Sequence, residues 1–135
     1  MKLLLALSAA AVLGSSTGPV LTAHPSTYGK AVFDGRGHVV YAFTRDHGRS
    51  ACYGECAKRW PPYYVPKGSL RIGAGLKRAL LGTVKRRNGR SQVTYAGRPL
   101  YYYVGDTGPG VIRCQDVFEF GGRWLILRPS GQLIR

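Results

Sequence analysis

The sequence predicts a small all-β or β-dominated domain built from two related β-hairpin repeats. The 135 residues include 19 Gly and 8 Pro, and aromatic residues make up 11% of the chain, a composition typical of strands and turns. A Y-x-aromatic-x-x-D pattern occurs twice, at an offset of 60 residues. A β-prone run and a turn precede each copy of the pattern, so each copy is expected to form a strand, a turn and a strand.

The N-terminal segment predicts export. Lys2 precedes an apolar run over 3–13, and small residues follow at 14–18, which is the layout of a signal peptide. The run is too short to cross a bilayer, which needs about 20 apolar residues. We place the signal peptide within 1–23, with the cut between Gly14 and Ala23, and one domain over 24–135. Because no Cys lies near the cut, we expect a protein that is not lipid-anchored by its own sequence.

The first copy is expected over about 28–68. Residues 31–33 and 39–43 are β-prone and flank a turn rich in glycine. Tyr41 and Phe43 share one strand face because they are two residues apart, and Asp46 follows the strand end. We interpret the two aromatic residues as core and the carboxylate as a group that fixes the next turn.

The second copy, over about 85–130, repeats this plan. Its motif residues are Tyr101, Tyr103 and Asp106, and the offset of 60 residues also places Trp60 over Phe120. Between the copies, leucines at 76–81 with basic neighbours predict one short amphipathic helix. An alternative for both motifs is that the tyrosine hydroxyls and the aspartates converge on a ligand or an ion.

The charge balance predicts anionic partners. The chain carries 20 Lys and Arg against 6 Asp and Glu, a net charge of +14, and +13 without Lys2. Outside the cytoplasm these partners are anionic envelope components or a glycan or peptide ligand, with peripheral membrane association but no nucleic acid. The densest cluster surrounds the turn dipeptide Asn88-Gly89, which predicts an exposed hairpin tip with anion-binding candidates Lys85, Arg86, Arg87 and Arg90. A merely solvated loop is the alternative.

The three cysteines predict a structural disulfide that involves Cys52 and Cys56. Local pairing of these two is the simpler expectation, and a bond from Cys56 to Cys114 would close a longer loop and stabilise the fold more. No cofactor is expected. The competing interpretation is a copper or zinc site formed by His47, Cys52 and Cys56, or a thiol-redox function of the two cysteines.

The aromatic segment Trp60-Pro61-Pro62-Tyr63-Tyr64 offers a binding surface, because two prolines hold the backbone extended without donating hydrogen bonds. Trp60, Tyr63, Tyr64 and Trp124 are its surface candidates, and core packing is the alternative. We expect no enzymatic activity, since the chain lacks P-loop, GxGxxG, HExxH and GxSxG patterns.

Several motifs occur in a recognisable order: the motif at 41–46, Cys52 to Pro62, Thr94-Tyr95-x-Gly97-x-Pro99 with the second motif, and Phe120-Gly121-Gly122-x-Trp124. In this order the chain resembles the bacterial secreted-repeat family, often described as predicted lipoproteins with a Yx(FWY)xxD motif. The resemblance covers about 28–135 and implies a periplasmic or extracellular protein of unassigned activity. The chain departs from that pattern in lacking the lipid-accepting cysteine and in carrying Cys114 where glycine is more usual.

These observations together predict an exported cell-envelope protein. The function we expect is a non-enzymatic binding module for an anionic or glycan-like envelope ligand. The alternative is a periplasmic metal-binding or thiol-redox protein that uses Cys52 and Cys56.

Overall fold

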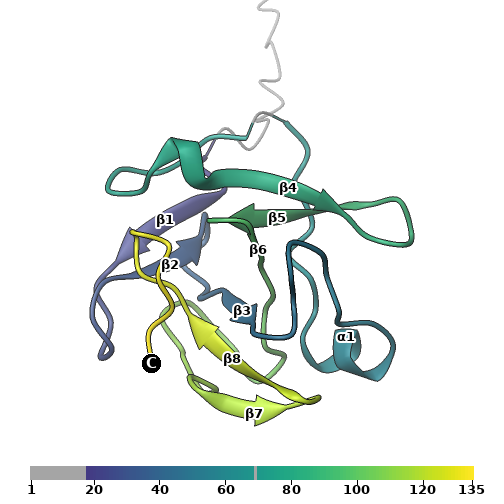
Figure 1. The fold of residues 1–135 in the computed structure, drawn as a ribbon. Coiled ribbons are helices and arrows are strands. Elements are labelled where there is room, and N and C mark those ends of the chain that lie inside the picture. The colour runs from purple at the N-terminus through teal and green to yellow at the C-terminus, as the bar shows by residue number, and fades with distance from the viewer. Residues whose placement is uncertain (1–17, 69) are drawn as a thin grey trace, which may run out of the picture.

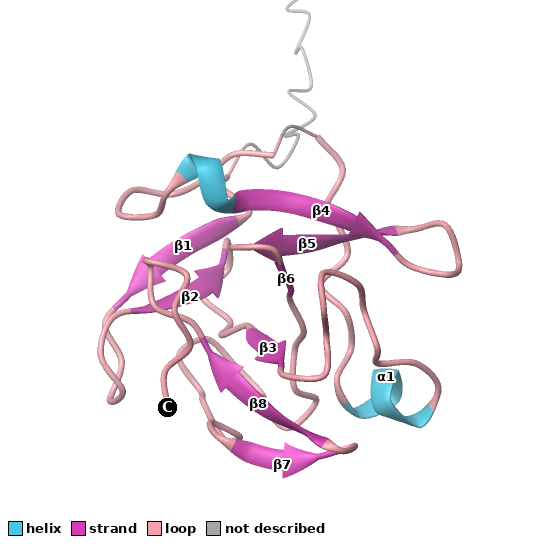
Figure 2. Cartoon of the chain, viewed as in Figure 1, coloured by secondary structure: helices cyan, strands magenta, loops and turns pink. Residues whose placement is uncertain are grey.

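A computed structural model describes residues 18–68 and 70–135 (Figure 1). The signal peptide predicted within 1–23 therefore lies mostly outside the described residues. Strands dominate the described chain, and its helical elements are the short α1 (Glu55–Arg59) and a 3-10 turn at Arg78–Leu80 (Figure 2). The predicted β-dominated fold with two repeats is confirmed.

The strands form three small antiparallel sheets with the orders β1-β2, β3-β8-β7 and β4-β5-β6. In Figure 1 the short β3 and β6 lie at the centre, with the β4-β5 hairpin above them and the β7-β8 hairpin below. The strands are β1 (Leu21–His24), β2 (Ala31–Asp34), β3 (Tyr41–Phe43), β4 (Leu81–Lys85), β5 (Ser91–Tyr95), β6 (Arg98–Pro99), β7 (Val117–Glu119) and β8 (Gly122–Ile126).

The two copies exchange their pairing strands. In the first copy β3 pairs with β8 of the second copy, which places Tyr41 opposite Ile126. Conversely, Tyr101 of the second copy pairs with Pro62 of the first. Between these pairs, Tyr41 and Tyr101 exchange two backbone N–H···O hydrogen bonds of 2.9 Å each. The copies are thus related by an approximate two-fold axis at these tyrosines, and each copy completes the other.

A ladder of four aromatic rings crosses this axis. The rings of Trp60 and Trp124 are parallel with centroids 4.0 Å apart, Phe43 stacks on Trp124 at 4.0 Å, and Tyr103 lies 4.8 Å from Trp60. Both tryptophans are fully buried. Stacked aromatic pairs add to the large apolar area that such rings bury, so this ladder is the centre of the core.

The ladder corrects the predicted alignment of the copies. Trp60 corresponds to Trp124 and not to Phe120. Each tryptophan lies against the second aromatic residue of a motif: Trp124 is opposite Phe43, and Trp60 contacts Tyr103. The chain from Asp106 to Trp124 is longer than the chain from Asp46 to Trp60. A fixed offset therefore fails after the motif.

The predicted helix between the copies is reduced to the 3-10 turn Arg78–Leu80, and Leu81 already starts β4. Thr83 and Val84 are β-branched, and β4 pairs with β5 along its whole length, so strand pairing prevails over the amphipathic pattern. The α-helix found among the described residues, α1, lies instead inside the first copy, after Gly54.

The first strand begins inside the range predicted for the signal peptide. Leu21 is fully buried, and Val20 donates its backbone N–H to the Arg71 carbonyl at 2.7 Å. The Val20 carbonyl accepts the Tyr63 hydroxyl at 2.7 Å. A cut after Ala23 would therefore remove most of β1.

We expect a chain that begins at His24 to unfold more readily than one that begins at Gly18. Loss of the buried Val20 and Leu21 side chains should lower the free energy of unfolding by at least about 3 kcal/mol. Urea unfolding of both chains measures the difference. Equal midpoints would show that this strand does not stabilise the domain.

Candidate functional site

The two motifs bind each other across the two-fold axis. The Tyr41 hydroxyl donates to Asp106 Oδ2 at 2.8 Å, and the Tyr101 hydroxyl donates to Asp46 Oδ2 at 2.8 Å. The second oxygen of each carboxylate accepts a backbone N–H, from Ala51 to Asp46 and from the corresponding loop residue to Asp106. The motif residues thus lock the two copies together within the core.

The Asp46 carboxylate is a buried titratable group. Burial raises the pKa of Asp46 from its ordinary value of 3.8 to about 6, although hydrogen bonds from Ala51 and Tyr101 and the positive charge of Arg86 oppose the shift. Burial also raises the pKa of Asp106. Both shifts mean that the folded state disfavours the charged carboxylate.

This pKa shift predicts that stability falls as the pH rises. Between the ordinary pKa of Asp46 and its raised value, the folded chain binds more protons than the unfolded chain. The free energy of unfolding should therefore be larger near pH 5 than near pH 7.5, by about 1 to 1.5 kcal/mol. Asp46→Asn should flatten this dependence in urea unfolding measured at both pH values. An unchanged slope in the variant would exclude Asp46 as the source.

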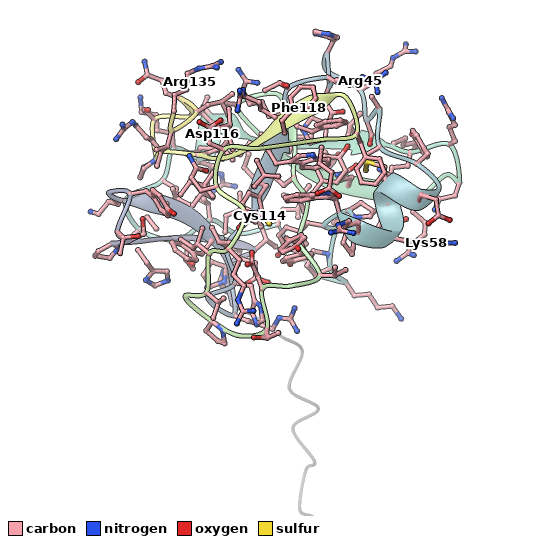
Figure 3. The ribbon with its side chains drawn as sticks, turned by 90° about the horizontal axis from the view of Figure 1, so that it is seen from below. Arg45, Lys58, Cys114, Asp116, Phe118 and Arg135 are labelled. Carbon is pink, nitrogen blue, oxygen red and sulfur yellow. A yellow bond between two sulfur atoms is a disulfide. The ribbon has the colours of Figure 1, made fainter. Side chains whose placement is uncertain are left out.

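The cysteines form one local disulfide, Cys52–Cys56, and Cys114 is free and buried. Figure 3 shows Cys114 near the middle of the molecule in this view and Lys58 at its margin beside α1. Cys114 follows the amide that binds Asp106, as Cys52 follows the amide that binds Asp46. It is therefore the counterpart of Cys52, whereas an offset of 60 residues would align it with Gly54.

Cys52 and Cys56, two of the three predicted metal ligands, are joined in the disulfide and so carry no thiolate that could bind a metal. His47 is exposed. Within residues 18–68 and 70–135, no group of three or more His, Cys, Asp or Glu side chains is placed to hold a metal ion.

The predicted aromatic surface is largely wrong. Trp60 and Trp124 are fully buried in the core ladder, and Tyr63 is buried as well. Burial raises the pKa of Tyr63 to about 12. Of the four candidates, only Tyr64 is partly exposed, and its ring lies beside Arg90 of the basic hairpin.

The basic hairpin tip, residues 86–90, is ordered by the residues around it. Arg86 N–H donates to the Arg90 carbonyl at 2.9 Å and closes the turn. The Asn88 side-chain amide donates to the Tyr64 hydroxyl at 3.1 Å. On the β4 side of the tip, the Arg87 backbone N–H donates to the Tyr53 hydroxyl at 3.4 Å.

Arg86 is buried, which corrects the prediction that all four basic residues lie exposed at the tip. Its Nη1 donates to Ser50 Oγ at 2.6 Å and to Gln92 Oε1 at 3.1 Å, and its Nη2 donates to the Cys52 carbonyl at 2.7 Å. Ser50 also hydrogen-bonds the Tyr101 hydroxyl, so this network reaches Asp46. Lys85, Arg87 and Arg90 are exposed as predicted.

A basic pocket of about 480 Å³ lies between the hairpin and the loop that follows the first motif. The guanidinium carbons of Arg86 and Arg87 lie 4.4 and 4.2 Å from the ring centroid of Tyr53. No acidic side chain lines the pocket among the described residues. Its lining residues are Arg49, Ser50, Tyr53, Val84, Lys85, Arg86 and Arg87.

A second pocket of about 420 Å³, here called the tyrosine pocket, borders the same hairpin through Arg90. The Arg90 guanidinium carbon lies 3.5 Å from the ring centroid of Tyr64. The lining contains three tyrosines, three cations and one acidic residue. Its residues are Gly18, Pro19, Val20, Asp34, Gly35, Arg36, Tyr63, Tyr64, Val65, Pro66, Lys67, Arg90 and Tyr102.

The approximate symmetry supplies an internal comparison for the basic pocket. The β1-β2 hairpin and the loop after the second motif enclose an equivalent pocket, which is lined by His24, Pro25, Phe33, Gly37, Pro109 and Gly110. By the strand registers, Ala31 takes the place of the buried Gln92 there. The lining of this pocket in the first copy therefore contains no Lys or Arg.

These features define a β-dominated protein of two strand-exchanged copies with a basic hairpin on its surface. A family model described as a secreted repeat of unknown function matches residues 22–63 and 82–128, which coincide with the two copies. The chain belongs to this family, and the predicted resemblance is confirmed. No curated protein and no solved structure matches the chain. Within the part of the chain that the structure describes, no helix has the length and apolar character of a membrane span.

Sequence reasoning identified the basic residues of the hairpin but missed their partners. Arg49, Ser50 and Tyr53 lie in the loop after the first motif and line the basic pocket. The available signal was the dense group of polar and aromatic residues that follows Asp46. Nothing local in the sequence indicates that this loop meets a hairpin about thirty residues later.

Proposed function

We propose that this chain is an exported, non-enzymatic binding module of the cell envelope that holds an anionic ligand in the basic pocket. The observation that carries the proposal is the collection of four cationic side chains, Arg49, Lys85, Arg86 and Arg87, without an acidic partner in the lining. The equivalent pocket of the first copy has no Lys or Arg in its lining. The concentration of charge in one copy alone favours a role in binding over a role in folding.

The electrostatics of the pocket support this proposal. Like charges held together in a concave site repel each other and focus a positive field, and an anion relieves that repulsion. Tyr53 holds two of the cations through its ring, and the buried Arg86 anchors the loop to the hairpin. The site is thus formed before a ligand arrives, which lowers the entropic cost of binding.

The location that we propose is the periplasm or the cell exterior, without a lipid anchor of the chain's own. The secreted-repeat family and the N-terminal apolar run with Lys2 support export. The net charge supports peripheral attachment to anionic surfaces, which weakens as salt screens the field.

Dextran sulfate, with neutral dextran as its uncharged counterpart, tests the function. The double variant Lys85→Ala/Arg87→Ala should bind dextran sulfate at least about tenfold more weakly than the unaltered chain, a loss of about 1.4 kcal/mol. Neutral dextran should not bind to either protein. Isothermal titration calorimetry at fixed salt measures the affinities.

The matched control is Lys77→Ala/Arg78→Ala, which removes the same charge from exposed residues outside both pockets. It should weaken binding by less than about twofold, because separated surface charges are screened. An equal loss in both double variants would show that net charge alone binds the polymer, and the proposal would be wrong.

A further inference from the structure

We infer that the anionic ligand is a linear acidic polysaccharide that crosses the hairpin tip and is gripped by two tyrosine-stacked arginines, Arg87 and Arg90. This inference rests on the proposed function and names its ligand class. It adds the tyrosine pocket as a second subsite beside the basic pocket.

Each of the two arginines is stacked on a tyrosine that is itself tied to the tip. Arg87 lies over Tyr53 and Arg90 lies over Tyr64, with guanidinium carbons 4.2 and 3.5 Å from the ring centroids. The Tyr64 hydroxyl accepts a hydrogen bond from Asn88, also in the tip. Such stacking fixes the plane of a guanidinium and leaves the N–H groups at its edge available.

These edges have no partner within residues 18–68 and 70–135. Neither guanidinium forms an ion pair with an acidic residue there, and Arg87 and Arg90 take part in hydrogen bonds only through their backbone atoms. A guanidinium held flat with free edges presents two parallel N–H donors, the geometry that binds a carboxylate, sulfate or phosphate in bidentate fashion.

The spacing of the two arginines indicates a ligand with repeated charge. Arg90 comes three positions after Arg87, so their Cα atoms lie at most about 11 Å apart. The turn between them is closed by the hydrogen bond from Arg86 to Arg90, which keeps both residues on one tip. Two forks on one turn are best occupied by two anionic groups of the same polymer.

The tyrosine pocket favours a polymer of sugar rings. Its volume of about 420 Å³ lies in the range of small-molecule sites and exceeds what one inorganic anion fills. Tyrosine rings suit the apolar face of a sugar, and Lys67 and Arg90 in the lining offer positive charge to its acidic substituent. Asp34, the acidic residue in the lining, forms an ion pair with Arg36 at 3.6 Å, and its carboxylate also accepts the Tyr102 hydroxyl and the backbone N–H groups of Arg36 and His38.

Oligogalacturonides of increasing length test the inference. A short oligomer fills one subsite, whereas a longer one engages both arginines, so affinity should rise more than tenfold over a narrow range of length. Arg87→Lys/Arg90→Lys keeps the charge and removes both forks, and it should bind the long oligomer at least tenfold more weakly without a length threshold. Fluorescence anisotropy of end-labelled oligomers measures both effects.

Arg71→Lys/Arg78→Lys is the matched control, since it makes the same exchange at exposed arginines outside both pockets, and it should bind like the unaltered chain. Thermal unfolding of both variants shows that the fold is retained. If Arg87→Lys/Arg90→Lys binds as tightly as the unaltered chain, the two forks do not recognise the ligand and the inference is wrong, while the proposed function stands.

Two further outcomes separate the inference from the proposed function. Polyphosphate of matched charge should bind more weakly than the oligogalacturonide, and equal or tighter binding would show that no sugar subsite exists. Failure of the chain to bind dextran sulfate, polyphosphate and oligogalacturonide alike would overturn the proposed function together with the inference.

Discussion

Replacing Trp124 with alanine is expected to lower the free energy of unfolding by about 3 to 5 kcal/mol, the usual cost of emptying a buried tryptophan site. The side chain is fully buried and stacks between the rings of Phe43 and Trp60. Its indole N–H also donates to the Glu119 carbonyl at 3.0 Å, so the substitution leaves that carbonyl without its donor. Urea unfolding at neutral pH measures the loss.

Two comparisons make this prediction specific. Phe118 is 66% exposed, so Phe118→Ala should change stability by less than about 0.5 kcal/mol. Trp60 lies in the same ladder, but its buried indole nitrogen has no hydrogen-bond partner among the described residues. Trp60→Phe should therefore cost less than Trp124→Phe, because only the second substitution breaks a hydrogen bond. A cost below 1 kcal/mol for Trp124→Ala would contradict the central role of the ladder.

The periodic part of the fold could be predicted from the sequence. Alternation places Tyr41 and Phe43 on one strand face, and the turn residues before them mark a hairpin, as the structure has it. The exchange of strands between the copies could not be predicted. A strand that pairs within its own copy and one that pairs with the other copy carry the same local pattern, and the choice depends on the whole chain.

The part of the candidate site that depends on local sequence could also be predicted. Asn88-Gly89 correctly indicates a turn with basic residues around it. Burial of Arg86 depends on Ser50 and Gln92, which the fold brings from two other segments. Trp60 was interpreted as a surface candidate because prolines follow it, and only its stacking on Trp124 of the second copy shows that it is core.

Strand exchange gives the second prediction of large effect: neither copy folds alone. We expect the separate segments 18–75 and 76–135 to be unfolded at neutral pH, with far-ultraviolet circular dichroism typical of disordered chains. Each segment alone lacks the strand that covers its own motif, β8 for the first and 62–65 for the second. The unpaired edges and the exposed aromatic rings cannot be compensated by so short a chain.

Mixing the two segments should restore the fold, because the cut falls between the copies at the exposed Ala74 and Gly75 and breaks none of the motif contacts. Substituting Asp106→Ala in the second segment should reduce the yield of the mixed complex, since it removes the acceptor of the Tyr41 hydroxyl. The same substitution cannot affect the first segment by itself. Cooperative unfolding of either isolated segment would contradict mutual completion, because it would show that one copy contains a whole core.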